Sequence, residues 1–487
     1  MHVSRRSIVS YVGLLGAIAG LAGCRVGPNY KRPAVDVPAA YRAPAIDESA
    51  GDEPTSERPE QRSTVTAQAP AKSFGDEKWW DLFQDRELQD LIRMALKNNY
   101  DVRIAATRVL EAQAKLGITR ADQFPTLGVG GNIASQQNPK LGPIPGYEVT
   151  LGQVSAPAAY DIDFWGKYRR ASESARATLL ANEWAQKEVI ATLVANVATG
   201  YFRLRQFDLE LEISKRTLAS RKNSLRLTQT LEQHGFDSLL DVRQSEQLVY
   251  TASAEIPELE RQIAQQENAI STLVGNNPGS IPRGLKLTEQ PHAPEVPAGI
   301  PSSLLERRPG IRQAEQNLIA ANANIGVARA AYFPQISLTA TPGFESPALS
   351  DLFSGPAGIW TMAESLTQPI FEGGRLKSTV RLTEAQRDEM TLAYQQAIQG
   401  AFRDVSDGLV AYRKDQEIRA EEEHLVQSAR DAARLSEVRF KSGSTDYLEV
   451  LTNETNAFTA ELGLAQAQGN ELVALVQLYQ VLGGGWQ

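Results

Sequence analysis

The most regular pattern of apolar positions lies in the first half of the chain. Apolar residues recur there at spacings of three, four or seven, with charged residues between them, as one face of a helix requires. The members of this seam are Ile190, Val194, Val197, Tyr201, Leu204, Phe207, Leu211, Leu218 and Leu225. No proline occurs between Pro157 and Pro257 or after Pro369. Proline destabilises the interior of a helix more than any other residue does. We therefore predict one helix over about 167–234 and another over about 375–441, each roughly 100 Å long.

Both predicted helices end at a turn that contains glycine. Gly235 and Gly443 each follow the last turn of a helix, where glycine is favoured because it adopts a left-handed backbone at little cost. Ser, Thr and Asp residues come next and are good N-caps for a returning helix. Each half of the chain therefore contains a long antiparallel helical hairpin, over about 167–275 and about 374–482.

Shorter segments alternate apolar and polar residues with a period of two, which indicates β-strands. They lie at about 123–134, 147–165, 333–342 and 359–371. The last segment alternates less cleanly, because Glu364 falls at the parity of Trp360 and Leu366. Loops rich in Pro and Gly separate the two strands of each pair. We therefore predict four strands, with one pair before each long helix.

The same order of elements occurs twice, and many residues recur at constant spacing. Arg103, Ala112, Gly117, Arg120, Phe124 and Pro125 recur as Arg312, Ala321, Gly326, Arg329, Phe333 and Pro334. Each copy reads helix, strand, loop, strand, long helix, turn, long helix. We therefore assign repeat 1 to 74–290 and repeat 2 to 291–487. A period this long is not that of a solenoid; it is that of a duplicated half-structure, which predicts pseudo-symmetry.

Four strands are too few to enclose a membrane pore. A sheet in lipid must close, because an open edge leaves backbone groups unpaired, and the smallest closed membrane barrels have about eight strands. Two copies would make a packed plug, whereas three copies of four strands make twelve and leave room for a channel. We therefore predict a mainly helical α+β membrane protein whose strands form a barrel shared between copies. The alternative is a two-stranded ribbon packed on helices in a soluble coiled-coil protein.

The N-terminus has the form of a secretion signal. The pair Arg5-Arg6 precedes an apolar stretch that is too short to cross a bilayer comfortably. This stretch ends in Leu21-Ala22-Gly23-Cys24, which looks like a bacterial lipobox. We therefore assign 1–23 to a cleaved signal peptide and expect Cys24 to carry N-acyl and diacylglycerol chains. Arg25 follows in place of an aspartate, which by the usual sorting rule for such lipoproteins favours the outer membrane.

Composition narrows the possibilities further. Residues 24–73 are rich in Pro, Ala, Glu and Ser and read as a lipid-anchored extended segment. Cys24 is the only cysteine, which excludes disulfides, and a net charge of −8 without a basic block argues against a nucleic-acid partner. The histidines of the mature chain, His234, His292 and His424, lack ligand spacing. Because no nucleophile elbow, P-loop or metal motif occurs either, we expect no enzyme, no metal and no cofactor besides the lipid.

Distinct motifs are spread along the mature chain. They are Cys24 with Val26-Gly27-Pro28-Asn29-Tyr30-Lys31-Arg32-Pro33; Trp79-Trp80-Asp81-Leu82-Phe83; Pro369-Ile370-Phe371-Glu372-Gly373-Gly374-Arg375; Arg439-Phe440-Lys441-Ser442-Gly443; Tyr447-Leu448-Glu449-Val450-Leu451; and Leu482-Gly483-Gly484-Gly485-Trp486. Together they resemble the outer membrane factor lipoproteins, the TolC-like efflux ducts of the OprM/NodT type. The resemblance implies a homotrimer with a periplasmic α-barrel and a shared twelve-stranded β-barrel in the outer membrane of a Gram-negative bacterium. It also implies a periplasmic adaptor (a membrane fusion protein) and an inner-membrane pump, usually of the resistance-nodulation-division class.

The resemblance implies passive conduction of drugs or other small molecules, gated at the periplasmic helix turns. The candidate gate and selectivity residues are Asp237, Asp241, Arg243, Arg439, Asp446, Glu449 and Glu454. In a trimer each becomes a ring of charges, and carboxylate rings attract cations. The family often has an acidic residue where this chain has Thr452, which leaves Glu449 or Glu454 as the candidate for a selectivity ring. Gly235 and Gly443 are candidate contacts for the adaptor.

Other interpretations stay open at this stage. A duct of the same kind would also serve type I protein export or metal-ion export. A lipid-anchored coiled-coil envelope scaffold without a pore would share the hairpins, but it would leave the alternating strands without a role. The charged residues near the turns would then only solvate the helix ends.

Overall fold

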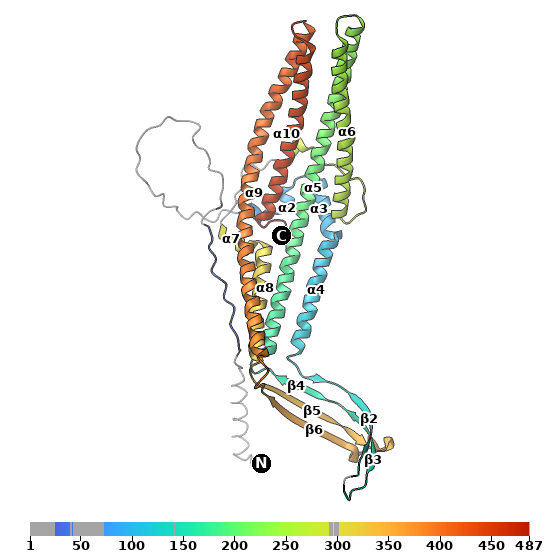
Figure 1. The fold of residues 1–487 in the computed structure, drawn as a ribbon, viewed down its shortest axis with the longest axis vertical. Coiled ribbons are helices and arrows are strands. Elements are labelled where there is room, and N and C mark those ends of the chain that lie inside the picture. Colours follow the sequence, from blue (N-terminus) through green and yellow to red (C-terminus); the bar gives the residue numbers. More distant parts are fainter. Residues whose placement is uncertain are drawn as a thin grey trace, which may run out of the picture. The chain divides into compact units, whose positions relative to one another are not determined.

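The computed structural model describes residues 25–38, 41, 73–140, 142–291, 296 and 301–486 (Figure 1). The predicted signal peptide, Cys24, His292 and most of the predicted extended segment lie outside these residues. The α-helices are α2 (Trp79–Leu82), α3 (Arg86–Asn98), α4 (Tyr100–Ala121), α5 (Lys167–Gln233), α6 (Leu239–Leu273), α7 (Pro301–Arg307), α8 (Pro309–Ala330), α9 (Arg375–Lys441) and α10 (Tyr447–Val481). Short 3-10 helices are η1 (Phe74–Asp76), η2 (Leu287–Glu289), η3 (Leu349–Asp351) and η4 (Gly355–Ala357).

Helices α5 and α9 are the two long helices that the absence of proline predicts. Each has 67 residues and is followed, after a short turn, by a returning helix of 35 residues. The predicted apolar seam of α5 is also confirmed: its members from Val194 to Leu204 are buried, and Ile190 and those from Phe207 to Leu225 are half-buried. Within the described ranges, no helix combines the length and the apolar character that crossing a membrane requires.

The chain divides into two compact units that differ from the two sequence repeats. One unit comprises 1–34, 108–183 and 313–395, and the other comprises 35–107, 184–312 and 396–487. Each repeat contributes to both units, because α5 and α9 each begin in the first unit and end in the second. The repeats are therefore repeats of sequence and topology and not separate folding bodies.

The strands form one antiparallel sheet within the first unit. They are β1 (Thr126–Leu127), β2 (Gly130–Asn138), β3 (Tyr147–Ser155), β4 (Ala158–Ile162), β5 (Gln335–Ser346) and β6 (Gly358–Thr367). Both β3 and β4 pair with β5 in a single register, and β2 and β1 pair with them in a single register as well. The six segments are therefore four strand paths in the order β1/β2, β3/β4, β5, β6, as many as the sequence predicts.

Prolines explain why the observed strand ends differ from the predicted ones. The strand predicted over 147–165 is interrupted at Pro157, which has no N–H to donate to the ladder. The strand predicted over 359–371 ends at Thr367, because Pro369 follows it and Pro334 precedes its partner β5. The two remaining strands likewise begin only after a proline, and they extend beyond the predicted ends, to Asn138 and Ser346.

The two faces of the sheet differ in polarity. Because paired residues share a face, the register places these side chains together on one face: Leu127, Val129, Ile133, Tyr160, Ile162, Ile336, Leu338, Phe344, Trp360, Met362 and Leu366. The opposite face carries Thr126, Asn132, Gln153, Asp161, Ser337, Thr339, Thr341, Thr361 and Ser365. Polar residues also lie on this face: Glu364 opposite Leu338, and, towards the loop between β2 and β3, Ser135, Gln137, Glu148 and Thr150. In the described chain, β1/β2 and β6 each keep one edge without a partner strand.

Candidate functional site

The turn between α5 and α6 is closed by its own backbone. Gly235 has a φ of 76° and donates its N–H to the carbonyl of Glu232 at 2.9 Å, while the N–H of Phe236 reaches the carbonyl of Leu231 at 2.9 Å. This pair of bonds is a Schellman motif, in which the residue in the left-handed region is usually glycine. The ring of Phe236 is 81% exposed. The first predicted adaptor contact therefore lies at a rigid turn with an apolar tip.

The predicted charged residues of this turn have separate local partners. Asp241 forms a capping box with Ser238, accepting its N–H at 3.2 Å and its hydroxyl at 2.5 Å. The Ser238 hydroxyl lowers the pKa of Asp241, whereas burial and the hydrogen bond with Asp241 raise the pKa of Asp237. Arg243 pairs with Glu246 at 2.6 Å on the helix surface. The first turn thus carries two neighbouring carboxylates whose pKa values are shifted in opposite directions.

The second turn repeats this geometry with a different charge arrangement. Gly443 has a φ of 71°, and Ser444 completes the Schellman motif to the carbonyl of Arg439 at 2.9 Å. The Arg439 side chain pairs with Glu449 at 2.8 Å and so joins the end of α9 to the start of α10. Asp446 is the N-cap residue of α10, exposed and without a side-chain capping bond. The structure therefore brings Arg439 and Glu449 together, with Asp446 beside them.

Glu454 does not belong to the turn. Its carboxylate is half-buried, accepts a hydrogen bond from the Ser224 hydroxyl at 3.5 Å and faces Arg221 of α5. Burial raises the pKa of Glu454, and the charge of Arg221 opposes that rise. Glu454 lines a cavity of about 340 Å³ between α5, α9 and α10. It is therefore placed between the two hairpins, away from the turn, and its predicted role in a selectivity ring stays a prediction.

Sequence reasoning missed the partner of Glu454. Arg221 is only 2% exposed, donates to the carbonyl of Leu248 at 2.9 Å and lies 4.9 Å from the ring centroid of Phe458. Its Nε has no hydrogen-bond partner in the described structure. Arg221 reads in the sequence as one of many charges between seam positions, so no local signal distinguishes it.

A second link between the hairpins lies along the same helices. Glu461 of α10 accepts Arg216 of α5 at 2.5 Å and Arg430 of α9 at 2.6 Å. Both arginines are largely exposed, so each pair contributes little stability by itself. Shared through one carboxylate, however, they join both hairpins at one point.

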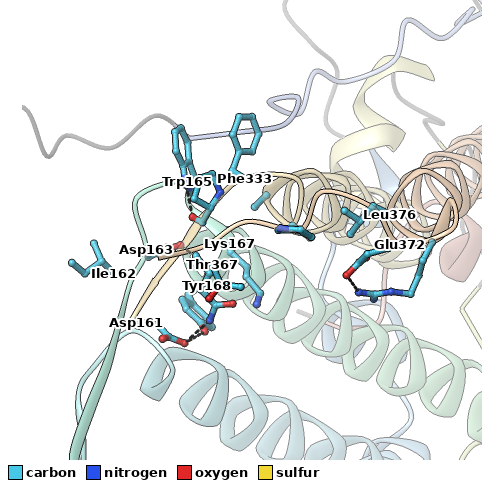
Figure 2. A pocket seen from close by; sticks show the side chains of 16 residues that line it. Asp161, Ile162, Asp163, Trp165, Lys167, Tyr168, Phe333, Thr367, Glu372 and Leu376 are labelled. Carbon is cyan, nitrogen blue, oxygen red and sulfur yellow. Dashed lines mark hydrogen bonds and ion pairs between the residues drawn. The ribbon is translucent and has the colours of Figure 1, made fainter. Parts of the chain in front are cut away.

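The other charged cluster lies where the sheet gives way to the helices, around a cavity of about 370 Å³ (Figure 2). Asp161 accepts hydrogen bonds from Ser337 at 2.5 Å and from the Tyr168 hydroxyl at 2.7 Å. Trp165 stacks on Phe333 with ring centroids 4.6 Å apart. These contacts tie the ends of β4 and β5 to the start of α5 and make a stiff joint. Across the described ranges, no group of three or more His, Cys, Asp or Glu side chains is placed to hold a metal ion.

A sheet with one apolar face and unpaired edges, joined to long hairpins with charged turns, defines a subunit of a membrane channel. A comparison with protein families agrees: the family described as outer membrane efflux protein matches residues 91–276 and 300–484, most of the chain and in two copies. The chain belongs to the outer membrane efflux protein family. It is an outer membrane exit duct of efflux systems and has the mixed α-barrel and β-barrel fold of the solved channels.

Individual relatives cover nearly the whole chain. The chain is 37% identical over 476 residues to the solvent efflux pump outer membrane protein SrpC of Pseudomonas putida, covering 96% of this chain and 97% of the relative. It is 32% identical over 471 residues to the cation efflux system protein CusC of Escherichia coli, covering 96% and 97%. The open-state crystal structure of the Neisseria gonorrhoeae MtrE outer membrane channel matches with a TM-score of 0.83 at 30% identity, covering 95% and 99%.

Proposed function

We propose that three copies of this chain form the outer membrane duct of a tripartite pump. The duct passively conducts small molecules that an inner-membrane pump delivers through a periplasmic adaptor, and it performs no catalysis. The observation that carries this proposal is the sheet, whose apolar face and two free edges have no use in a single subunit. Four strand paths from each of three copies make twelve, enough to close around an aqueous pore.

Helix α4 gives independent support for self-association. Its apolar residues Ile104, Leu110 and Ile118 are exposed, with Leu110 at 64%. The corresponding helix of repeat 2, α8, is largely covered, with Leu318 at 2% and Ile319, the counterpart of Leu110, half-buried. Helix α9 also has exposed leucines, for example Leu382 and Leu392. Because pseudo-equivalent helices are expected to have equivalent neighbours, we assign α4 a partner helix from the next copy.

The helix turns supply the adaptor contact and the gate. Gly235 and Gly443 hold the two tips, and exposed apolar side chains flank them at Phe236, Leu240 and Leu448. An apolar tip with a charged rim is the ordinary composition of a protein-binding surface. We assign the selectivity charges to Asp237, Asp241, Arg243, Arg439, Asp446 and Glu449, and the hairpin-coupling charge to Glu454.

We further propose that Cys24 carries the N-acyl and diacylglycerol chains that its lipobox predicts, and that this lipid is the only attached group. Cys24 lies outside the described residues, so the sequence alone supports this assignment. Mass spectrometry of the mature N-terminus tests it directly.

The substrate class is proposed as small organic molecules, because the relatives at 35–37% identity are named for antibiotics, toluene and solvents. The cation efflux relative at 32% identity makes metal ions the second candidate. A deletion strain distinguishes them: the first predicts hypersensitivity to solvents and antibiotics, and the second predicts hypersensitivity to metal salts alone.

The duct itself is tested with purified protein in planar bilayers. We expect discrete single-channel currents from a particle whose native mass is three chains. A protein that passes no current, or that stays monomeric in detergent, would identify a scaffold and overturn the proposal.

A further inference from the structure

Glu364 lies on the apolar face of the sheet, near its helix side, the end at which the strands continue into α5 and α9. It comes three residues before the end of β6 at Thr367. Leu338 is opposite it in the register, and Met362 and Leu366 are its neighbours on the same face of β6. Glu364 is exposed and forms no hydrogen bond or ion pair with any described residue. Its negative charge is therefore unbalanced among apolar side chains.

The strands supply no positive charge that could pair with Glu364. Neither lysine nor arginine occurs in any of the segments β1 to β6, whose charged residues are Glu148, Asp161, Glu345 and Glu364. The same holds for the β1/β2 path of another copy, which the proposed ring places beside β6. A cation that pairs with Glu364 therefore comes from outside the barrel strands.

Glu364 also lines a shallow groove on the apolar face. The groove has a volume of about 390 Å³ and crosses β4, β5 and β6. Two rows of side chains that are paired in the register stand along it. From the helix side, the rows are Tyr160, Leu338 and Glu364, and then Ala158, Ala340 and Met362. The groove is therefore polar at both ends of its helix-side row and apolar farther from the helices.

The Tyr160 hydroxyl is the second polar group of the helix-side row. It has no hydrogen-bond partner among the residues that the structure describes. Tyr160 and Glu364 flank Leu338 from two neighbouring strands, so their Cα atoms are about 10 Å apart. A phenol donates to a phosphate oxygen, and a carboxylate accepts from an ammonium group. The row is therefore complementary to a headgroup that carries both a phosphate and an ammonium.

The polarity of the groove matches that of a phospholipid in a bilayer. This step rests on the proposed function, in which the apolar face of the closed barrel faces lipid. Strands of membrane barrels rise about 3.4 Å per residue and tilt about 35–45°, so Glu364 lies roughly 8 Å from the helix-side end of β6 along the membrane normal. A headgroup fits at this depth, and its hydrocarbon then extends over Ala158 and Ala340 towards the middle of the bilayer.

We propose that this groove binds a phospholipid with a primary ammonium in its headgroup, taken from the leaflet on the helix side. The ammonium donates to Glu364, the phosphate accepts from Tyr160, and an acyl chain lies over Ala158 and Ala340 beside Met362. An unpaired carboxylate near hydrocarbon is costly, and the ammonium offsets that cost. A trimethylated ammonium has no N–H to donate, and a glycerol headgroup has no cation, so phospholipids of these two kinds should bind more weakly.

Native mass spectrometry of the purified full-length trimer tests the proposal. The trimer is stripped of lipid in detergent and incubated with phosphatidylethanolamine, phosphatidylcholine or phosphatidylglycerol, each with the same acyl chains. These probes differ only in their headgroups. We expect the trimer to retain several-fold more phosphatidylethanolamine than either of the other two lipids.

Three variants separate the headgroup contacts from general lipid binding. Glu364→Gln should abolish the preference for phosphatidylethanolamine, because the amide carries no charge. Tyr160→Phe keeps the ring and should lower the retention of all three lipids, since each has a phosphate. Glu345→Gln is the matched control: it removes the same charge from the opposite face of the sheet, where Glu345 pairs with Gln153, and should keep the preference.

Equal retention of the three lipids by the wild type, or an unchanged preference in Glu364→Gln, would overturn the proposal. Retention of phosphatidylglycerol that a chelator of divalent cations abolishes would identify a bridging metal ion and overturn it as well. The same spectra report the number of chains in each particle. Particles that are not trimers contradict the proposed duct, whereas trimers without a headgroup preference contradict the lipid site alone.

Discussion

At the scale of single residues, the side chains that couple the helices are charged groups withdrawn from water. Arg170 donates hydrogen bonds to residues 26, 27 and 29 and pairs with Glu173 of its own helix at 2.8 Å. Arg221 and Glu454 instead face each other across two hairpins. Such a pair is sensitive to protonation, because burial disfavours the charged form of both groups.

Glu454→Gln should change how stability depends on pH. The folded-state pKa of Glu454 is raised above its unfolded value, so its contribution is fully present at low pH and is lost as the pH rises through the folded pKa. The difference in unfolding temperature, variant minus wild type, should therefore be larger at pH 8 than at pH 5. Thermal unfolding of the detergent-solubilised trimer at both values measures this difference.

Glu421→Gln is the matched control, since Glu421 is exposed on α9. Its unfolding temperature should follow the wild type across the same range. If Glu454→Gln also follows the wild type, the half-buried carboxylate has no influence on stability.

The glycines of the turns and of the helices should respond to alanine in opposite ways. Gly443→Ala forces a side chain into the left-handed region at a φ of 71° and should cost about 1 kcal/mol. Gly400→Ala lies inside α9, with no atom within 4 Å of the added Cβ, and should gain about 0.5–1 kcal/mol. Chemical denaturation of both variants measures the change in the free energy of unfolding that each substitution causes. Changes of the same sign and size would contradict the turn geometry.

Which buried charges matter could not be predicted from the sequence. Glycine and proline act on their own backbone, so Gly235 and Gly443 are recognisable from local pattern alone. The role of Arg170 depends on Val26 and Asn29, more than a hundred positions away, and no spacing rule connects them.

At the scale of elements, prolines set where strands begin, end and break. Pro157 faces Gly128 across the ladder and accepts its N–H at 2.9 Å, but it has no N–H to return. The helix ends were predicted closely for the same local reason, since proline-free stretches and glycine turns delimit them. The register between strand paths was not predictable, because it depends on pairing between the two repeats.

Pro157→Val should restore the missing donor. A bond from the new N–H to the carbonyl of Gly128 is worth about 0.5–1.5 kcal/mol, and Val favours strands. Hydrogen exchange followed by mass spectrometry should show slower exchange across 155–158 than in the wild type. Pro139→Val, in the loop between β2 and β3, is the control and should leave exchange in that window unchanged.

At the scale of the whole molecule, the duplication is complete in topology but unequal in surroundings. Helix α8 is covered by residues of its own chain, including residues 27–32, whereas α4 is left open. The strand count alone predicts that several copies are needed. The candidate for a shared helix, α4, is recognised only when the exposure of the two repeats is compared in three dimensions.

Leu110→Glu should therefore prevent assembly. Burying a leucine is worth about 1.5–3 kcal/mol per copy, and a charge at that position adds a desolvation cost. Native mass spectrometry should find monomers in place of trimers. Glu111→Gln, at the neighbouring exposed position, should still give trimers; trimers from Leu110→Glu would remove α4 from the interface.

The two free edges of the sheet are unlike one another, since one belongs to β1/β2 and the other to β6. Such subunits join head to tail, and every member of the ring must supply both edges. One subunit with a damaged edge therefore prevents closure of a ring whose other subunits are intact. In a cell where half the subunits carry a damaged edge, only about one trimeric ring in eight would contain three intact subunits. Alleles that damage β6 should accordingly behave as dominant, whereas alleles that abolish synthesis should be recessive.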